Sequence, residues 1–157
     1  MPTMARLIAG IFMALAGVIV IIVVVNEFPD AEYDQFPMAV TAAIVGFLVG
    51  WRGLGRKMGV EDTKVTLLGM RAGISMFIWV LFFFGLWRMI EGIMKQEFYQ
   101  PLSAILTLFA RMVYLGRIAV TNMPVLITMI ILSMLAGIIT KNAWLKWDQS
   151  KDLTINR

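Results

Sequence analysis

Cysteine and histidine are both absent from this chain of 157 residues. Without them the chain forms no disulfide and has no thiolate nucleophile. Haem ligation by histidine or cysteine and ordinary zinc sites are excluded. Imidazole general-base catalysis is excluded as well. The sequence also shows no Walker lysine motif, nucleophile elbow or dinucleotide-binding glycine pattern. We therefore expect no catalytic, metal or cofactor site, and a protein that is not an enzyme.

Charged residues are also scarce, at 15% of the chain, whereas 60% of the residues are hydrophobic. A soluble domain usually has about a quarter of its residues charged. The apolar residues come in long blocks with the charges concentrated between them, which is the distribution that lipid requires. The net charge of +4 then indicates basic loops that face anionic lipid, and no nucleic-acid partner.

Four of these blocks predict an all-α integral membrane four-helix bundle within a single membrane domain, residues 1–147. A helix of about 20 apolar residues spans the hydrocarbon core of a bilayer. The predicted spans cover about 6–26, 36–52, 66–90 and 123–141, and a polar cytoplasmic tail follows at 148–157. A signal peptide is the alternative for the first block. That block is too long for an ordinary signal sequence, and no small-x-small cleavage site precedes Asn26.

Small residues recur at a spacing of four in these spans, and we expect them to form helix-packing faces. Glycine, alanine and serine let helix backbones approach closely in lipid. Because the second span is especially rich in them, we expect it to lie inside the bundle. The positions expected to pack, against this protein's own helices or foreign ones, are Gly46, Gly50, Gly69, Gly73, Ser133 and Gly137.

Residues 101–120 have a different pattern, with a polar stripe along one side of an otherwise apolar helix. The stripe covers about 120° of a helical wheel and consists of Ser103, Thr107, Arg111, Tyr114 and Arg117. This predicts an amphipathic helix between the third and fourth spans, which lies in the interface or caps the bundle. A fifth span is the alternative, against which its two arginines argue.

Four spans would place ten of the 14 lysines and arginines on one side of the membrane and four on the other. The positive-inside rule then predicts a bacterial inner-membrane protein with both termini in the cytoplasm. Residues near the basic side are expected to contact lipid headgroups or an anion, namely Arg52, Arg56, Lys57 and Arg71. Tryptophans at the ends of spans are expected as interface anchors, namely Trp51, Trp87, Trp144 and Trp147.

The sequence offers little for ion transport or for copper binding. Arg88 and Glu91 are three residues apart and are expected to pair at the end of the third span. Transporters usually need ionisable groups near the midplane of the membrane. No second ionisable residue lies deep in any predicted span. The 13 methionines are spread over separate segments, which fits flexible apolar filling better than a Cu(I) site.

Several short stretches, taken in order, resemble the TrgA family, small alphaproteobacterial membrane proteins associated with tellurite resistance. They are residues 1–7, Gly50-Trp51, Gly69 and Gly73, the aromatic third span, and residues 99–101, 135–140, 143–144 and 146–147. The resemblance covers almost the whole chain. It implies a phenotype but no mechanism, because reducing tellurite needs thiols or a redox cofactor, and it supplies no catalytic residues.

Three functions follow as hypotheses. The first is a non-catalytic, TrgA-like inner-membrane protein that acts in tellurite or other oxyanion stress. The second is an accessory or structural subunit of a larger photosynthetic or respiratory membrane complex, and the third is a small transporter. The expected partners are membrane lipids and other transmembrane helices, in a homo-oligomer or a larger complex.

Overall fold

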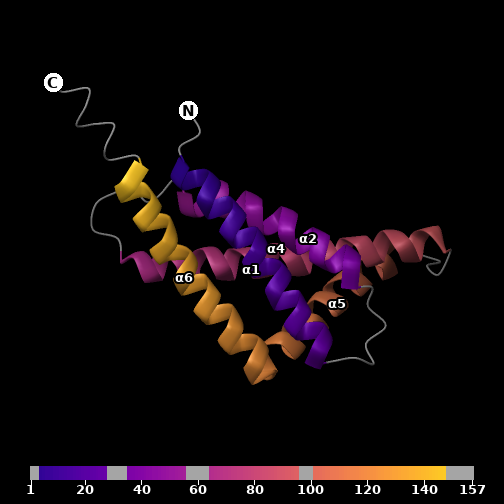
Figure 1. The fold of residues 1–157 in the computed structure, drawn as a ribbon. Coiled ribbons are helices and arrows are strands. Elements are labelled where there is room, and N and C mark those ends of the chain that lie inside the picture. Colours follow the sequence, from indigo (N-terminus) through magenta and orange to yellow (C-terminus); the bar gives the residue numbers. More distant parts are fainter. Residues whose placement is uncertain (1–3, 28–34, 56–63, 96–100, 148–157) are drawn as a thin grey trace.

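The computed structural model describes residues 4–27, 35–55, 64–95 and 101–147. These ranges are helical except at a few helix ends and contain no strand, which confirms the predicted all-helical fold for this part of the chain. The elements, drawn in Figure 1, are α1 (Met4–Glu27), α2 (Gln35–Val49), the π-helical turn η1 (Gly50–Leu54), α4 (Val65–Met94), α5 (Pro101–Thr121) and α6 (Met123–Trp147).

Within the described residues, five helical stretches are long and apolar enough to cross a membrane by length and composition, namely α1, α2 with η1, α4, α5 and α6. In lipid every backbone N–H and C=O must be satisfied within the protein, and a helix does this within one segment. Buried hydroxyl groups must likewise form hydrogen bonds within the protein. Ser133 and Thr140 each donate a hydrogen bond, of 2.6 and 2.7 Å, to the carbonyl oxygen four residues earlier.

Helices α1 and α2 run antiparallel and touch along their small residues. Gly46 lies against the backbone of Met13, and Gly50 lies against that of Ala9. A Cβ atom on Gly46 would be only 2.5 Å from the Met13 carbonyl oxygen, so only glycine permits this approach. The α2 helix then continues into η1, whose π-type bond runs from the Gly55 N–H to the Gly50 carbonyl.

Helices α4 and α6 also run antiparallel, because the beginning of α4 lies beside the second half of α6. Gly69 contacts the backbone of Ser133 and Gly137, and Gly137 in turn contacts that of Val65. At the other end of the bundle the Asn122 side-chain N–H donates to the Glu27 carboxylate over 3.5 Å. The last residue of α1 therefore lies beside the beginning of α6, so α1 and α6 are antiparallel too.

Helix α5 folds back along the second half of α4, where Gly85 lies beside Leu108 and Gly116 beside Leu81. A single residue, Asn122, separates α5 from α6. Since α6 returns beside α4, α5 starts and finishes at one end of the bundle, the end where α4 stops and α6 begins (Figure 1).

Two clusters of buried residues form the core. The first joins α1, α2 with η1, α4 and α6, and includes Met13, Val45, Leu54, Met76 and Ala136. The second joins α1, α2, α4 and α5, and consists of Ile21, Met38, Ala42, Phe84 and Leu115. Helix α5 is thus part of the packed core at its own end of the bundle.

The expectation that the second span lies inside the bundle is wrong. Helix α2 exposes a ridge of large apolar side chains at a spacing of four, namely Phe36, Val40, Ile44 and Leu48. Its small residues occupy the opposite face, which contacts α1. Small residues therefore mark one close-packed face of this helix, and the rest of its surface remains exposed.

Candidate functional site

The six small residues expected at packing faces all lie in contacts within the bundle. Gly46 and Gly50 contact α1, and Gly69, Gly73, Ser133 and Gly137 form the contact between α4 and α6. Gly73 lies directly against the Ser133 hydroxyl oxygen. These faces are therefore filled by the protein's own helices, which leaves other surfaces for any foreign helix.

Basic side chains gather at the end of the bundle where α1 begins and α6 stops. Those described are Arg6, Arg52, Lys64, Arg71, Lys141 and Lys146. The only carboxylates within the described ranges, Glu27 and Glu91, belong to the opposite end. That opposite end also holds four basic side chains, namely Arg88, Lys95, Arg111 and Arg117. Among the described residues one end is therefore purely basic, whereas the other has mixed charge.

Arg52 and Arg71, two of the residues expected to contact headgroups or an anion, are both exposed. Arg71 shares a face of α4 with Lys64, one position before the helix and seven residues earlier, so its side chain can extend toward that basic end. Arg6 packs against Gly55, and its Nε atom is buried without a hydrogen-bond partner among the described residues. Arg56 and Lys57 lie outside the described residues.

The four tryptophans expected as anchors fall into two groups. Trp87 and Trp147 are exposed, at 61% and 49% of their surface, as an interface position requires. Trp51 and Trp144 are half-buried. The Trp51 ring lies 5.5 Å from the ring of Phe47, and Trp144 packs against the first core cluster, so these two also contribute to the packing of the bundle.

The predicted pairing of Arg88 with Glu91 is confirmed, with 2.8 Å between the guanidinium and carboxylate. Lys95 joins the same carboxylate at 2.8 Å from one turn further along. Water and salt screen ion pairs at such an accessible helix end, so they contribute little to stability. The three side chains therefore form an ordinary charged end of α4.

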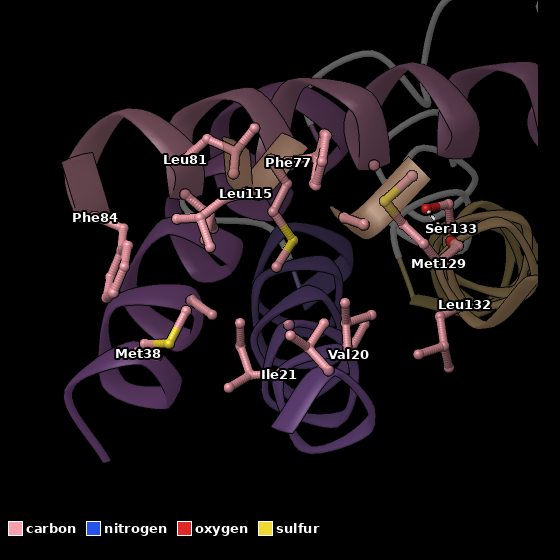
Figure 2. Close-up of a pocket in the computed structure, with 18 of the residues that line it drawn as sticks. Val20, Ile21, Met38, Phe77, Leu81, Phe84, Leu115, Met129, Leu132 and Ser133 are labelled. Atoms are coloured by element: carbon pink, nitrogen blue, oxygen red, sulfur yellow. Dashed lines mark hydrogen bonds between the residues drawn. The ribbon is translucent and has the colours of Figure 1, made fainter. Parts of the chain in front are cut away.

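A cavity of about 80 Å³ lies where α1, α2, α4, α5 and α6 meet. We call it the central cavity. Figure 2 shows the side chains that line it, among them Val20, Phe77, Leu115 and Leu132, around one common space. Among the described residues that line it, only Ser133 has a polar side chain, and its hydroxyl already donates to the Met129 carbonyl. The space between the helices is thus almost entirely hydrocarbon and thioether.

Four methionines line this cavity from four different helices, namely Met13, Met38, Met76 and Met129. The sequence predicts only flexible apolar filling for the methionines, because nothing in their spacing shows that these four share one space. Met76 comes close enough that a Cβ atom on Gly17 would collide with it. Flexible thioether side chains adapt to irregular guests, so the lining suits an apolar molecule of variable shape.

A second hollow, of about 350 Å³, lies at the joint between α5 and α6. It is lined by Tyr114, Arg117, Ile118, Thr121 and Asn122. Tyr114 and Arg117 belong to the polar stripe predicted for this helix, and both are exposed. We call this hollow the α5 groove, and it offers a guanidinium, two hydroxyls and an amide within one stretch of chain.

The surface of α5 is divided into three faces. Ala104, Leu108 and Leu115 are buried against the bundle, and the polar stripe follows on one side of this inner face. A third face is apolar and exposed, and consists of Leu102, Ile105, Leu106, Phe109, Val113 and Val120. A helix with polar and apolar faces that are both exposed is suited to the boundary between water and lipid.

The sequence matches no protein-family model and no curated protein, and the structure matches no solved structure. The resemblance to the TrgA family therefore remains a prediction based on the order of short motifs.

Proposed function

We propose that the chain is a four-span protein of the bacterial inner membrane and that α5 lies at the outer surface without crossing. The antiparallel packing of α4 with α6 supports this, because Gly69 lies beside Ser133 and Gly137. A crossing α5 would instead return the chain to the side where α4 began and make α6 run parallel to α4. The polar stripe and exposed apolar face of α5 fit an interfacial position.

The unequal charge of the two ends supports an orientation with both termini in the cytoplasm. Arg6, Arg52 and Lys64 lie at the end where α1 begins, and the described carboxylates lie at the other. Cytoplasmic sides of membrane proteins carry the excess of lysine and arginine, which face anionic lipid there. Membrane lipids are thus the first partners that we propose.

Within this membrane we propose a non-catalytic, TrgA-like role in tellurite or other oxyanion stress, exerted through the membrane or a partner protein. The observation that carries this is the composition of the interior. Of the described side chains that line the central cavity, Ser133 carries a hydroxyl and the others are apolar. Such a lining favours the binding of apolar molecules over the chemistry of a charged oxyanion.

The membrane arrangement predicts a specific pattern of labelling for single-cysteine variants, which the absence of native cysteine makes straightforward. In spheroplasts a membrane-impermeant maleimide is expected to label Lys95→Cys and Thr121→Cys, which flank α5. Asn142→Cys, near the end of α6, is expected to react only after the membrane is opened. All three positions are exposed at helix ends.

A fifth span would give a different pattern, because Lys95→Cys and Thr121→Cys would then label from opposite sides. The same labelling after permeabilisation is the control that all three thiols are reactive. Protection of both α5 flanks together with labelling of Asn142→Cys would reverse the proposed orientation but keep the four spans.

The physiological role is tested by deleting the gene in its native host and measuring growth on tellurite. We expect a lower tolerance that is restored by the wild-type gene, without loss of tellurite-reducing activity in extracts, because the chain supplies neither thiols nor an imidazole. Unchanged tolerance together with unchanged tellurite uptake would contradict the role in oxyanion stress.

An accessory or structural subunit of a larger photosynthetic or respiratory complex is the second candidate. It is favoured by an exposed aromatic cluster in the middle of α4, where Trp79 lies 5.8 Å from Phe83 and 5.9 Å from Phe82, between ring centroids. Such a cluster can contact a foreign helix or pigment. Co-purification with a pigment- or haem-containing complex in mild detergent would favour this candidate, and purification alone would disfavour it. A small transporter remains the third candidate and has no comparable supporting observation.

A further inference from the structure

The central cavity and the α5 groove adjoin each other. Ile118 lines both of them, together with polar side chains in the groove and apolar side chains in the cavity. Its neighbour Ala119 lines the cavity, and Arg117 lines the groove. Within three consecutive residues α5 therefore passes from a polar hollow to an apolar one, which is the arrangement that an amphiphilic ligand requires.

The cavity is suited to hydrocarbon and unsuited to water. Water needs two to four polar partners in a buried site. In the described part of the lining the one polar side chain is the Ser133 hydroxyl, which already donates to the Met129 carbonyl at 2.6 Å. The four methionines in the lining can adjust to the course of a flexible chain. A chain that enters past Ile118 and Ala119 would meet apolar groups on all sides.

The α5 groove is suited to a phosphate that is accompanied by an ammonium group. Arg117 forms no ion pair within the described residues, and with the hydroxyls of Tyr114 and Thr121 it offers donors for phosphate oxygens. Asn122 lines the same groove and has a side-chain oxygen that is buried without a hydrogen-bond partner. Beside Asn122 lies the Glu27 carboxylate, which attracts a cation.

From this combination we propose that α5 holds one phospholipid with an ethanolamine-type headgroup. Its phosphate contacts Arg117, and its ammonium group lies toward Asn122 and Glu27. Only a short segment of one hydrocarbon chain, smaller than a benzene ring, enters the central cavity, because the volume there is about 80 Å³. The site uses the polar stripe for the headgroup and the inner face of α5 for the chain. This proposal rests on the membrane placement proposed above but requires neither its orientation nor the role in oxyanion stress.

The headgroup is tested by titrating phosphatidylethanolamine into the full chain, purified in mild detergent and freed of lipid, with bound lipid counted by native mass spectrometry. We expect one tightly bound molecule per chain. Arg117→Gln should weaken binding about tenfold, as expected for one charge-assisted hydrogen bond. Arg111→Gln is the matched control, since Arg111 is an exposed arginine of the same helix outside the groove, and its binding should be unchanged.

The hydrocarbon chain is tested with a second matched pair. Ala119→Phe fills the wall of the cavity and should weaken binding about tenfold or more, whereas Ala110→Phe, on the exposed side of α5, should have no effect. Glycerophosphoethanolamine, which has the headgroup but no chains, should fail to compete. Circular dichroism of each variant shows that it is folded, and the Arg117 pair provides the test if Ala119→Phe does not fold.

The preference for an amine is tested with phosphatidylglycerol. We expect the wild type to bind it about tenfold more weakly than phosphatidylethanolamine, and Glu27→Gln to bind the two lipids equally well. Equal affinity of both lipids for the wild type would overturn the ammonium contact. Equal binding by Arg117→Gln and Arg111→Gln would overturn the site as a whole. Because this measurement is made in detergent, its failure is distinct from a failure of the labelling or growth experiments.

Discussion

Replacing Gly69 with leucine is expected to separate α4 from α6 and to destabilise the bundle strongly. A Cβ atom at this position would collide with the Ser133 carbonyl oxygen and lie 3.0 Å from the Gly137 nitrogen. These are backbone atoms, which cannot rotate away as a side chain does. Overpacking in a tight interior costs about 1–3 kcal/mol, occasionally more, and thermal unfolding in detergent followed by circular dichroism measures the loss.

Gly53→Leu is the control for this prediction. A Cβ atom there would meet only the Val49 Cγ1 atom, at 3.9 Å, and glycine is a poor helix former. We expect this variant to unfold at or near the wild-type temperature. If Gly69→Leu were as stable as Gly53→Leu, the close contact between α4 and α6 would be wrong.

The second large effect is expected for Leu54→Ala, at the end of η1. Leu54 has no exposed surface and belongs to the first core cluster, where α1, α2 with η1, α4 and α6 meet. Truncating a buried leucine leaves a cavity and costs about 2–5 kcal/mol in soluble cores. Within lipid or detergent the lost packing contacts remain the main cost, so we expect a loss of about 2 kcal/mol.

Leu48→Ala provides the comparison, because Leu48 lies on the exposed ridge of α2 with 57% of its surface accessible. Its side chain contacts detergent rather than the core, and the free energy of unfolding should change by less than about 0.5 kcal/mol. The difference between the two alanine variants, measured in the same detergent, isolates burial from the change of residue type. Equal losses for both would contradict the burial of Leu54.

The helical fold was predictable from the sequence because its cause is local. A long apolar segment in lipid must satisfy its own backbone, and only the composition of that segment is needed to recognise it. The helix-packing glycines were predictable for a similar reason, since their spacing of four places them on one face. Which helices they contact depends on the tertiary structure, and it emerged only there, as with Gly69 and Ser133.

The two hollows were not predictable, because their members come from distant parts of the sequence. Met13 and Met129 are separated by most of the chain and yet line one cavity. The polar stripe of α5 was visible in the sequence, but the place of Asn122 beside Glu27 was not. That contact depends on α6 returning antiparallel to α1, which no local pattern determines.

The exposed ridge of α2 illustrates a related limit. Its glycines and alanines suggested burial on all sides, whereas Phe36 and Leu48 are exposed at either end of the helix. Average composition does not separate the faces of a helix when lipid and protein interior are equally apolar. Only the positions of the small residues around the helix carry that information.

The joint of one residue between α5 and α6 has a mechanical consequence. The Asn122 N–H bonds to the Ile118 carbonyl, and the Leu126 N–H bonds to the Asn122 carbonyl, both at 3.1 Å. Because the linking residue is hydrogen-bonded to both helices, one helix cannot rotate freely relative to the other. A displacement of α5 is therefore transmitted to α6, and through the Ser133 contact to α4. A movement at the end of the bundle that holds α5 is in this way coupled to helices that reach the other end.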